Sequence, residues 1–337
     1  MTTVFVTGGA GFIGSNFIRY WLSKYPDDFV INYDLLTYAG NLSSLTDVVE
    51  KHEGHYMFVK GDIGNYELVH HLFDHYEPDY VVNFAAESHN SRAVLHPDIF
   101  YRTNVLGTQT LLQAARDAGL PRFHHISTCE VYGDLPLDSD EVFVETSPYR
   151  PRTPYNASKA AADLAVRAYF ETFHLPVTIT NCSNNYGPYQ FPEKLIPHFT
   201  IRLLQNQKMP LYRSSRNKRE WLHVDDHCRA IDLVLRRGKI GETYNIGSGV
   251  EADIETVADI LLDIFDLDQS YKTYVEDRPG HDRRYLLDST KIRSQLGWAP
   301  QMPFEEGFRA TVLWYRENSW WWKPLVKKLQ VDEEAWR

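Results

Sequence analysis

The stretch VTGGAGFIG at residues 6–14 constrains the fold more than any other feature of the chain. It follows an apolar run and places Gly8, Gly11 and Gly14 at the start of a helical pattern. Glycines between a strand and a helix allow a tight turn and a close approach of the backbone to a diphosphate. The N-terminus of the helix adds unpaired N–H groups that favour an anion. The stretch therefore predicts a dinucleotide-binding turn.

Short apolar runs alternate with helix-period segments through the first half of the chain. We expect strands at residues 4–8, 29–34, 57–62, 80–85 and 122–127, and helices near 12–25, 65–75, 98–118 and 156–174. Such alternation is typical of an α/β fold with a doubly wound, Rossmann-like parallel sheet. After residue 177 the pattern loosens. We predict a cofactor-binding domain over residues 1–175 and a smaller, mainly substrate-binding lobe over residues 176–337, with segments that cross between them.

Two aspartates follow at predicted strand ends. Asp34 lies 20 residues beyond Gly14, where a carboxylate can accept hydrogen bonds from ribose hydroxyls and repel a 2′-phosphate. This placement favours NAD over NADP. Asp62 stands in GDI (61–63) and suits the adenine, although an N-terminal role in the next helix explains it equally well.

Tyr155 and Lys159 are four residues apart on a predicted helix, so both side chains lie on one face. An ammonium beside a phenol favours the phenolate, and we expect it to lower the pKa of Tyr155. Such a tyrosine can remove a hydroxyl proton while a nicotinamide accepts hydride from the same carbon. Because the pair follows the glycine-rich turn by about 140 residues and Thr128 by 27, it indicates a nicotinamide-dependent site.

The composition narrows the possible partners. A formal net charge of −10 argues against a nucleic-acid binder or a membrane-surface protein, since both need a basic face. Three cysteines without CxxC spacing predict neither a disulfide framework nor a metal site. No apolar run reaches membrane-spanning length and the first residues carry no leader pattern, so we expect a cytoplasmic protein.

Several longer stretches carry a more specific pattern. They are VTGGAGFIGS (6–15), LTYAGNLSSL (36–45), AAESH (85–89), FHHIST (123–128), EVYGDLP (130–136), PYNASKA (154–160), TNCSNNYGPYQFPEKLIP (180–197), GETYNIG (241–247) and DRPGHDRRY (277–285). In them the chain resembles the extended short-chain dehydrogenase/reductases, and within that group the dTDP-glucose 4,6-dehydratases. The resemblance runs from about residue 3 to residue 315.

The resemblance implies residues for each ligand. Those expected around NAD are Gly8, Gly11, Phe12, Ile13, Gly14, Asp34, Asp62, Ile63, Ala85, Ala86, Ser88, Thr103, Tyr155 and Lys159. Those expected around a nucleotide-diphosphate hexose are Ser88, Thr128, Asn184, Glu193, Lys194, Leu195, Arg219, Arg278 and His281. The two arginines also belong to basic groups in an acidic chain, and guanidinium donors suit a diphosphate.

The resemblance also implies a reaction in three steps. Tyr155 takes the C4 hydroxyl proton, with Thr128 on that hydroxyl, as hydride passes to NAD. Glu130 then removes the C5 proton while water leaves from C6, and the hydride returns to C6. NAD is thus expected to stay tightly bound and to be regenerated in each cycle. A homodimer, formed through the helices near 98–118 and 156–174, is implied in the same way.

The chain departs from the family beside Glu130. The family has an aspartic acid, the general acid for the leaving hydroxyl, where this chain has Cys129. A protonated thiol can donate a proton, although weakly; alternatively Cys129 fills space while Glu130, Tyr155 or water supplies the proton. Residues 86–92 lack the usual Val-Asp pair, and residues 245–253 are shortened and lack an asparagine found near the nucleotide.

The run Ser-Thr-Cys-Glu-Val-Tyr-Gly at residues 127–133 is similar to one in UDP-N-acetylglucosamine 5,6-dehydratases, which return hydride to C4 and leave a 5,6-alkene. We predict a NAD-dependent sugar-nucleotide hydro-lyase, first of all a dTDP-hexose 4,6-dehydratase. A 5,6-dehydratase, a 4-epimerase and a weakly active NAD-binding homologue are the alternatives. The sequence leaves the nucleobase, the hexose and the pathway open.

Overall fold

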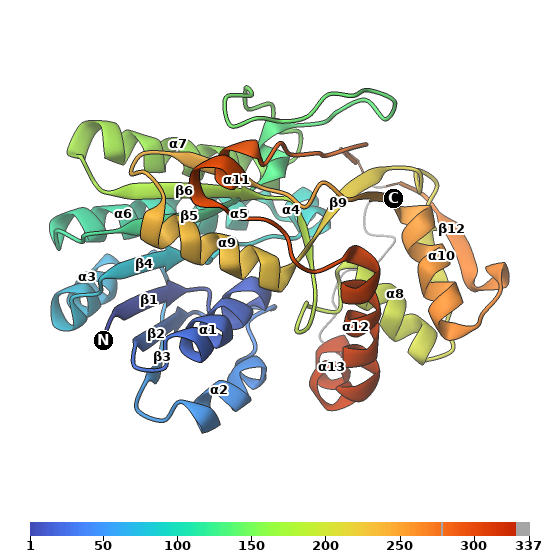
Figure 1. Cartoon of the computed structure of the whole chain (residues 1–337), viewed down its shortest axis with the longest axis horizontal. Coiled ribbons are helices and arrows are strands. Elements are labelled where there is room, and N and C mark those ends of the chain that lie inside the picture. The colour runs from blue at the N-terminus through green and yellow to red at the C-terminus, as the bar shows by residue number, and fades with distance from the viewer. Residues whose placement is uncertain (278, 328–337) are drawn as a thin grey trace.

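A seven-stranded parallel sheet forms the centre of the molecule (Figure 1). The computed structural model describes residues 1–277 and 279–327. The strands run in the order β10-β6-β5-β4-β1-β2-β3, and every neighbouring pair is parallel. Their bounds are β1 (Thr3–Thr7), β2 (Phe29–Asp34), β3 (Tyr56–Lys60), β4 (Tyr80–Asn83), β5 (Phe123–Thr128), β6 (Val177–Cys182) and β10 (Thr243–Ile246). The predicted doubly wound α/β fold is confirmed.

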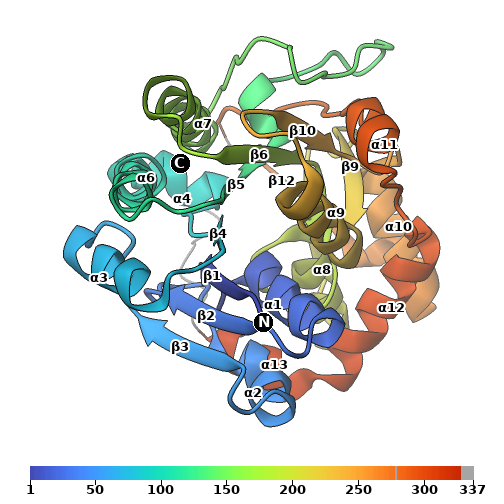
Figure 2. The ribbon, with the colours of Figure 1, turned by 60° about the vertical axis from the view of Figure 1, so that its left-hand side comes forward.

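Helices cover both faces of this sheet (Figure 2). The bounds are α3 (Tyr66–Tyr76), α6 (Thr108–Asp117) and α7 (Pro154–Phe173) on one face, and α1 (Phe12–Lys24) and α9 (Val224–Arg237) on the other. Apolar side chains of each layer, such as Leu111 and Val166 on one side and Trp21 and Ile231 on the other, are fully buried against the strands. The sheet is therefore apolar on both faces, as buried parallel sheets are.

The five strands predicted before residue 130 agree with the structure to within two residues at each end. The helix predicted near 98–118 is one helical stretch with an irregular middle: α5 (Pro97–Phe100), a π-helical segment η2 (Tyr101–Gly107) and α6. The predicted Thr103 lies in this π-helical segment, a conformation that is frequent at functional sites.

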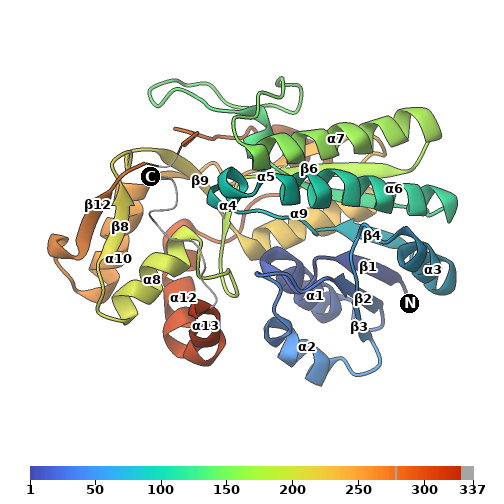
Figure 3. The same ribbon diagram turned by 180° about the vertical axis from the view of Figure 1, so that it is seen from behind.

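A second group of elements lies at one end of the sheet (Figures 1 and 3). Its bounds are β7 (Asn184–Tyr186), α8 (Leu195–Leu204), β8 (Met209–Tyr212), β9 (Lys218–His223), β11 (Glu251–Asp253), α10 (Ile254–Phe265), η4 (Gln269–Tyr271), β12 (Lys272–Val275), α12 (Phe304–Glu317) and α13 (Ser319–Val326). The chain crosses between the two groups, because α9 and β10 return to the central sheet. The shorter elements elsewhere are η1 (Leu42–Leu45), α2 (Thr46–Lys51), α4 (Asn90–Leu95), η3 (Cys129–Tyr132) and α11 (Thr290–Leu296).

No helix within residues 1–277 and 279–327 is long and apolar enough to cross a membrane.

Candidate active site

Gly8 lies where the two neighbouring strands β1 and β4 end. Its φ is +67°, and a β-carbon there would stand 2.6 Å from the backbone nitrogen of Ala85, the second residue after β4. The chain leaves β1 toward β2 and leaves β4 toward β5, on opposite sides of this pair. Ligands of doubly wound sheets bind at such a switch point, beside the carboxyl ends of the strands. The glycine is thus required by backbone conformation and by close contact together.

We expect Gly8→Ala to release bound NAD and to destabilise the protein, because the new methyl group collides with the Ala85 backbone. Gly54→Ala is the matched control: Gly54 also has a positive φ (+81°), but a β-carbon there meets nothing within 4 Å. Left-handed backbone alone costs a non-glycine residue about 1–2 kcal/mol, which both variants share. Thermal unfolding and the NAD released by acid measure the difference. Equal NAD content in the two variants would contradict the prediction.

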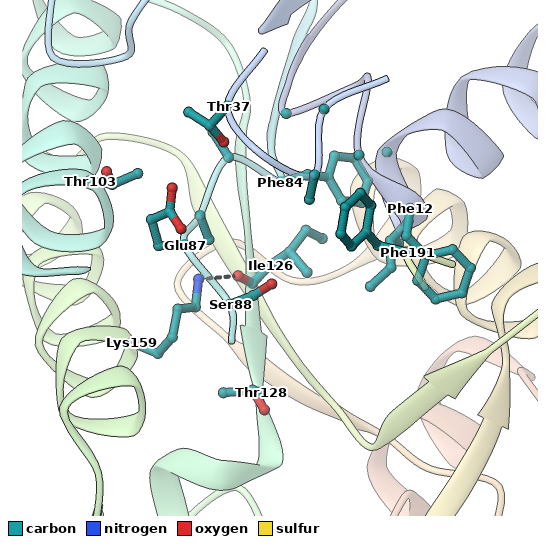
Figure 4. A pocket seen from close by; sticks show the side chains of 18 of the residues that line it. Phe12, Thr37, Phe84, Glu87, Ser88, Thr103, Ile126, Thr128, Lys159 and Phe191 are labelled. Atoms are coloured by element: carbon teal, nitrogen blue, oxygen red, sulfur yellow. Dashed lines mark hydrogen bonds between the residues drawn. The ribbon is translucent and has the colours of Figure 1, made fainter. Parts of the chain in front are cut away.

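A cavity of about 310 Å³ opens at this switch point. All of the residues predicted around NAD, from Gly8 to Lys159, line it. Asp34 is held at the end of β2, where its carboxylate accepts from the backbone N–H of Ala10 (2.9 Å) and of Leu36 (2.7 Å). Burial raises the pKa of this carboxyl. Figure 4 shows the aromatic side chains of Phe12, Phe84 and Phe191 on one side of the cavity and Lys159 on the other.

The lining residues fit a dinucleotide. α1 begins at Phe12, and no described side chain caps its N-terminus, so its first N–H groups and the positive end of its dipole are available to a diphosphate. A β-carbon on Gly14 would stand 2.4 Å from the carbonyl oxygen of Gly8, so the turn stays narrow. Asp62 accepts from the N–H of Gly64 (2.8 Å), whereas Asn65 caps α3. Asp62 is therefore not the helix cap.

The residues predicted to be catalytic come together from two elements. Thr128 ends β5, and Cys129 and Glu130 open η3, so the three follow one another at the sheet edge. Tyr155 and Lys159 project from the first turns of α7, which begins at Pro154 behind an N-cap from Thr153. Proline at the first position and a threonine cap both favour a helix start here. All five predicted residues line the same cavity: Thr128, Cys129, Glu130, Tyr155 and Lys159.

Residues of strand β5 hold the side chain of Lys159 in place. Its Nζ donates to the carbonyl oxygen of Ile126 (2.6 Å, Figure 4) and lies 3.3 Å from Nε2 of His125. The same His125 nitrogen is 3.4 Å from Oδ1 of Asp163, and the other carboxylate oxygen of Asp163, Oδ2, accepts from the Ser127 hydroxyl (2.7 Å). Burial lowers the pKa of Lys159 to about 8, against the opposing charge of Asp163.

The structure corrects the expected pKa of Tyr155. Burial, followed by the negative charge of Glu130, raises the pKa of the phenol well above its ordinary value, and a hydrogen bond with Thr128 opposes this rise. The expected lowering by Lys159 is not found in this arrangement, because the ammonium is directed to Ile126 and His125. The sequence spacing was right about the shared face but did not show the cost of burying the phenol.

Cys129 is buried, with 1% of its surface exposed, yet it lines the cavity. Its other neighbours are apolar and aromatic residues of one cluster, including Val131, Tyr132 and Tyr285. Burial and then the charge of Glu130 raise the pKa of the thiol well above its ordinary value. The sulfur therefore carries its proton at neutral pH.

A second cavity of about 330 Å³ adjoins the first on the side of α8. Five residues line both cavities: Ser88, Glu130, Asn184, Glu193 and Lys194. Of the other residues predicted for the hexose nucleotide, Leu195, Arg219 and His281 line the second cavity, and Thr128 lines the first. Arg278 lies outside the described residues. Glu130 thus stands where the two cavities meet.

The basic residues around Arg219 take different positions. Arg219 is buried, with its guanidinium donating to the carbonyl oxygens of Lys218 (2.7 Å) and Asp282 (2.8 Å). Arg213 and Arg216 are exposed, pair with surface carboxylates and line neither cavity. Of these three arginines, Arg219 is therefore the one that lines the site.

Three residues beside Glu130 were not predicted. Asn90 donates from its amide to a Glu130 carboxylate oxygen (2.9 Å). Tyr285 lines the second cavity, and Cys182 lines the first. All three stand within or next to the stretches that carry the family resemblance, which is the signal that could have found them. In the part of the chain that the structure describes, no group of three or more His, Cys, Asp or Glu side chains is arranged to hold a metal.

The family model described as GDP-mannose 4,6 dehydratase matches residues 5–311. The chain belongs to this family. It is 47% identical to the dTDP-glucose 4,6-dehydratase of Salmonella typhimurium, over 94% of each chain, and 49% identical to that of Mycobacterium tuberculosis, over 95% of each. The predicted family is confirmed.

Solved structures give the same result for the fold. The dTDP-glucose 4,6-dehydratase DesIV from Streptomyces venezuelae, solved with NAD bound, superposes with a TM-score of 0.92 at 50% identity, covering 96% of this chain and all of that one. A UDP-glucose 4-epimerase from Thermotoga maritima superposes with a TM-score of 0.87 at 28% identity, covering 94% of this chain and all of that one. The extended short-chain dehydrogenase/reductase fold is thereby confirmed.

Proposed function

We propose that this protein, a NAD-dependent hydro-lyase of its family, removes water from dTDP-glucose to give a 4-keto-6-deoxy sugar. The observation that carries the proposal is the meeting of two cavities at Glu130, with Tyr155 and Lys159 on the first. An epimerase needs the Tyr155–Lys159 pair but has no use for a carboxylate at that point. Eight relatives that are 45–49% identical to this chain are named dTDP-glucose 4,6-dehydratases, one of them as probable.

The chain's own residues bind and orient the reactants. The glycine-rich turn and Asp34 hold NAD, which when bound supplies a hydride acceptor and donor and a positive charge that favours the Tyr155 phenolate. Tyr155 takes the proton of the C4 hydroxyl, and Thr128 holds that hydroxyl. Lys159, fixed by Ile126, places its positive charge on the side of the cavity where Tyr155 lies. The carbon becomes a ketone by losing both a proton and a hydride.

The ketone makes the C5 proton acidic, and Glu130 removes it. As the C5–H bond breaks, a C5–C6 double bond forms and the C6–O bond breaks, so the hydroxyl leaves and needs a proton to depart as water. The Cys129 thiol, protonated for the reasons given above, donates it. Glu130 then returns its proton to C5 as hydride adds at C6, which completes a 4-keto-6-deoxy sugar. The proton that Tyr155 took restores the Cys129 thiol, so all three side chains regain their starting states.

The test is to incubate the purified protein with dTDP-glucose and no added NAD. We expect mass spectrometry to show the loss of one water and a carbonyl reagent to trap the product. A product that has lost water but does not react with the reagent would indicate a 5,6-alkene with its C4 hydroxyl restored. An unchanged mass with both dTDP- and UDP-hexoses would overturn the proposed function.

Cys129→Ala is expected to slow the elimination at least about tenfold, because general acids contribute about 10²–10⁴ in rate and a thiol is a weak one. Cys182→Ala is the matched control: Cys182 is also a buried thiol that lines the first cavity, but the mechanism gives it no proton to transfer. Product formation is followed by mass spectrometry. If Cys129→Ala and Cys182→Ala have equal rates, Cys129 only fills space.

The proposal includes the organisation of the protein. Residues 1–175 mainly hold NAD and residues 176–337 mainly hold the nucleotide sugar. The exposed apolar side chains of the neighbouring segments η2 and α7, among them Leu106, Leu164 and Phe173, support a homodimer. Light scattering measures the molar mass in solution and so tests this. Three buried free cysteines fit a reducing compartment such as the cytoplasm.

A further inference from the structure

A chain of side-chain hydrogen bonds connects Glu130 to the start of α7. The Asn90 amide nitrogen donates to Oε2 of Glu130 (2.9 Å), and the Thr153 hydroxyl donates to the amide oxygen of Asn90 (2.7 Å). The Thr153 hydroxyl oxygen in turn accepts from the N–H of Asn156 (3.2 Å) as the N-cap of α7. The three side chains come from η3, α4 and the residue before α7, so no local sequence pattern connects them.

The hydrogen-bond donors and acceptors from Glu130 through Asn90 to Thr153 match in only one orientation of the Asn90 amide. A carboxylate accepts, so Asn90 presents its NH₂ to Glu130, and its oxygen is then free to accept from the Thr153 hydroxyl. The amide is thereby fixed at both ends. A side chain held at both ends loses little further freedom when it orients its neighbour, which is the requirement for a preorganised site.

The orientation of the Glu130 carboxylate matters because of where this residue lies. Glu130 stands at the junction of the two cavities, and Asn90 lines the second. Cys129 and Tyr155 line the first cavity together with Glu130, and Tyr285 lines the second. Tyr155 lies two residues after Thr153, and the hydrogen-bonded chain therefore relates the C5 base to the helix that carries the C4 base.

We propose that Asn90 is a positioning residue that holds the Glu130 carboxylate ionised and directed toward C5, with Thr153 fixing Asn90. This rests on the proposed dehydratase function and adds a residue to it. Asn90 contacts Glu130, the C5 base, so we expect its loss to slow proton removal at C5 rather than the earlier oxidation at C4.

The test separates these two steps in a single turnover. Oxidation at C4 appears as the near-ultraviolet absorbance of reduced NAD, and proton removal at C5 is reported by a 5-deuterated substrate and by the formation of product. Asn90→Leu keeps the size of the side chain and removes both hydrogen bonds. We expect C4 oxidation within about twofold of the wild type and a C5 step slowed about 10²-fold, the effect of a misplaced reactive group, with a larger C5 isotope effect.

Asn90→Asp provides the second measurement, because it keeps the shape and replaces the donor with a carboxylate. Two carboxylates at hydrogen-bond distance share a proton, because like charge strongly raises the pKa of one of them. We therefore expect the deficit of this variant to be largest at low pH and to shrink as the pH rises, as Glu130 becomes ionised. An unchanged pH profile would show that residue 90 does not act on the Glu130 carboxylate and would contradict the proposal. Asn90→Asp also carries the test if Asn90→Leu proves unstable.

Thr153→Val tests the second hydrogen bond, and Thr153→Ser is its matched control, since serine keeps both the helix cap and the hydroxyl. We expect only Thr153→Val to slow the C5 step. The proposal is overturned if Asn90→Leu has a normal C5 step, or if it slows C4 oxidation and the C5 step equally. Failure of the wild type to release any water is a different result, because it overturns the proposed function itself.

Discussion

Tyr155→Phe is expected to lower kcat by about 10²–10⁴-fold, the usual contribution of a general base, and to prevent the absorbance of reduced NAD from appearing with substrate. The substitution removes one oxygen from a buried ring and leaves its packing against Phe100 in place. Because C4 oxidation is the first step, all later steps stop as well. Stopped-flow absorbance with dTDP-glucose measures the effect.

Tyr169→Phe is the matched control. Tyr169 lies on the same helix, α7, and its hydroxyl donates to Gln113 (3.1 Å) rather than facing either cavity. We expect this variant to keep wild-type activity. A Tyr155→Phe protein that oxidises C4 at a rate within a few-fold of Tyr169→Phe would exclude Tyr155 as the base.

Glu130→Gln is expected to stop the reaction after C4 oxidation, at removal of the C5 proton. The amide cannot accept the C5 proton, so product formation falls by about 10²–10⁴-fold, while Tyr155 and Lys159 still oxidise C4. Reduced NAD then accumulates on the enzyme, and the C5 hydrogen does not exchange with deuterated water. The two readouts together separate this variant from Tyr155→Phe, in which neither event takes place.

Glu276→Gln controls for the substitution itself. Glu276 is exposed and pairs with Arg213 at the surface, so we expect no change in either readout. Rapid turnover by Glu130→Gln, or loss of C4 oxidation with it, would contradict the role given to Glu130. The first result would place the C5 base elsewhere, and the second would make Glu130 part of the oxidation.

The predictions from sequence were accurate where one short segment decides the outcome. The strand before Gly8, the turn itself and the helix after it depend on residues within a few positions of one another, and the alternation of strands and helices repeats this pattern. The strand β10 was missed, because TYNI at residues 243–246 is too short to stand out in an irregular region. Only its pairing with β6 makes it part of the sheet.

The candidate site shows the same division. Spacing along the chain placed Tyr155 and Lys159 on one helix face, and the family resemblance named most of the residues that line the two cavities. Spacing did not predict the raised pKa of Tyr155, because burial is a property of the whole fold. It did not predict Asn90 either, whose partners Glu130 and Thr153 are 40 and 63 residues away in the sequence.

The opening glycine-rich turn and the Tyr155–Lys159 spacing were therefore determined by the sequence alone, because backbone sterics and helix periodicity act over a few residues. The tertiary structure decided which side chains meet at Glu130, how the Lys159 ammonium is held, and that Cys129 is a buried, protonated thiol. These depend on distances between residues far apart in the chain and on exclusion of water, and both arise only when the sheet and its covering elements pack together.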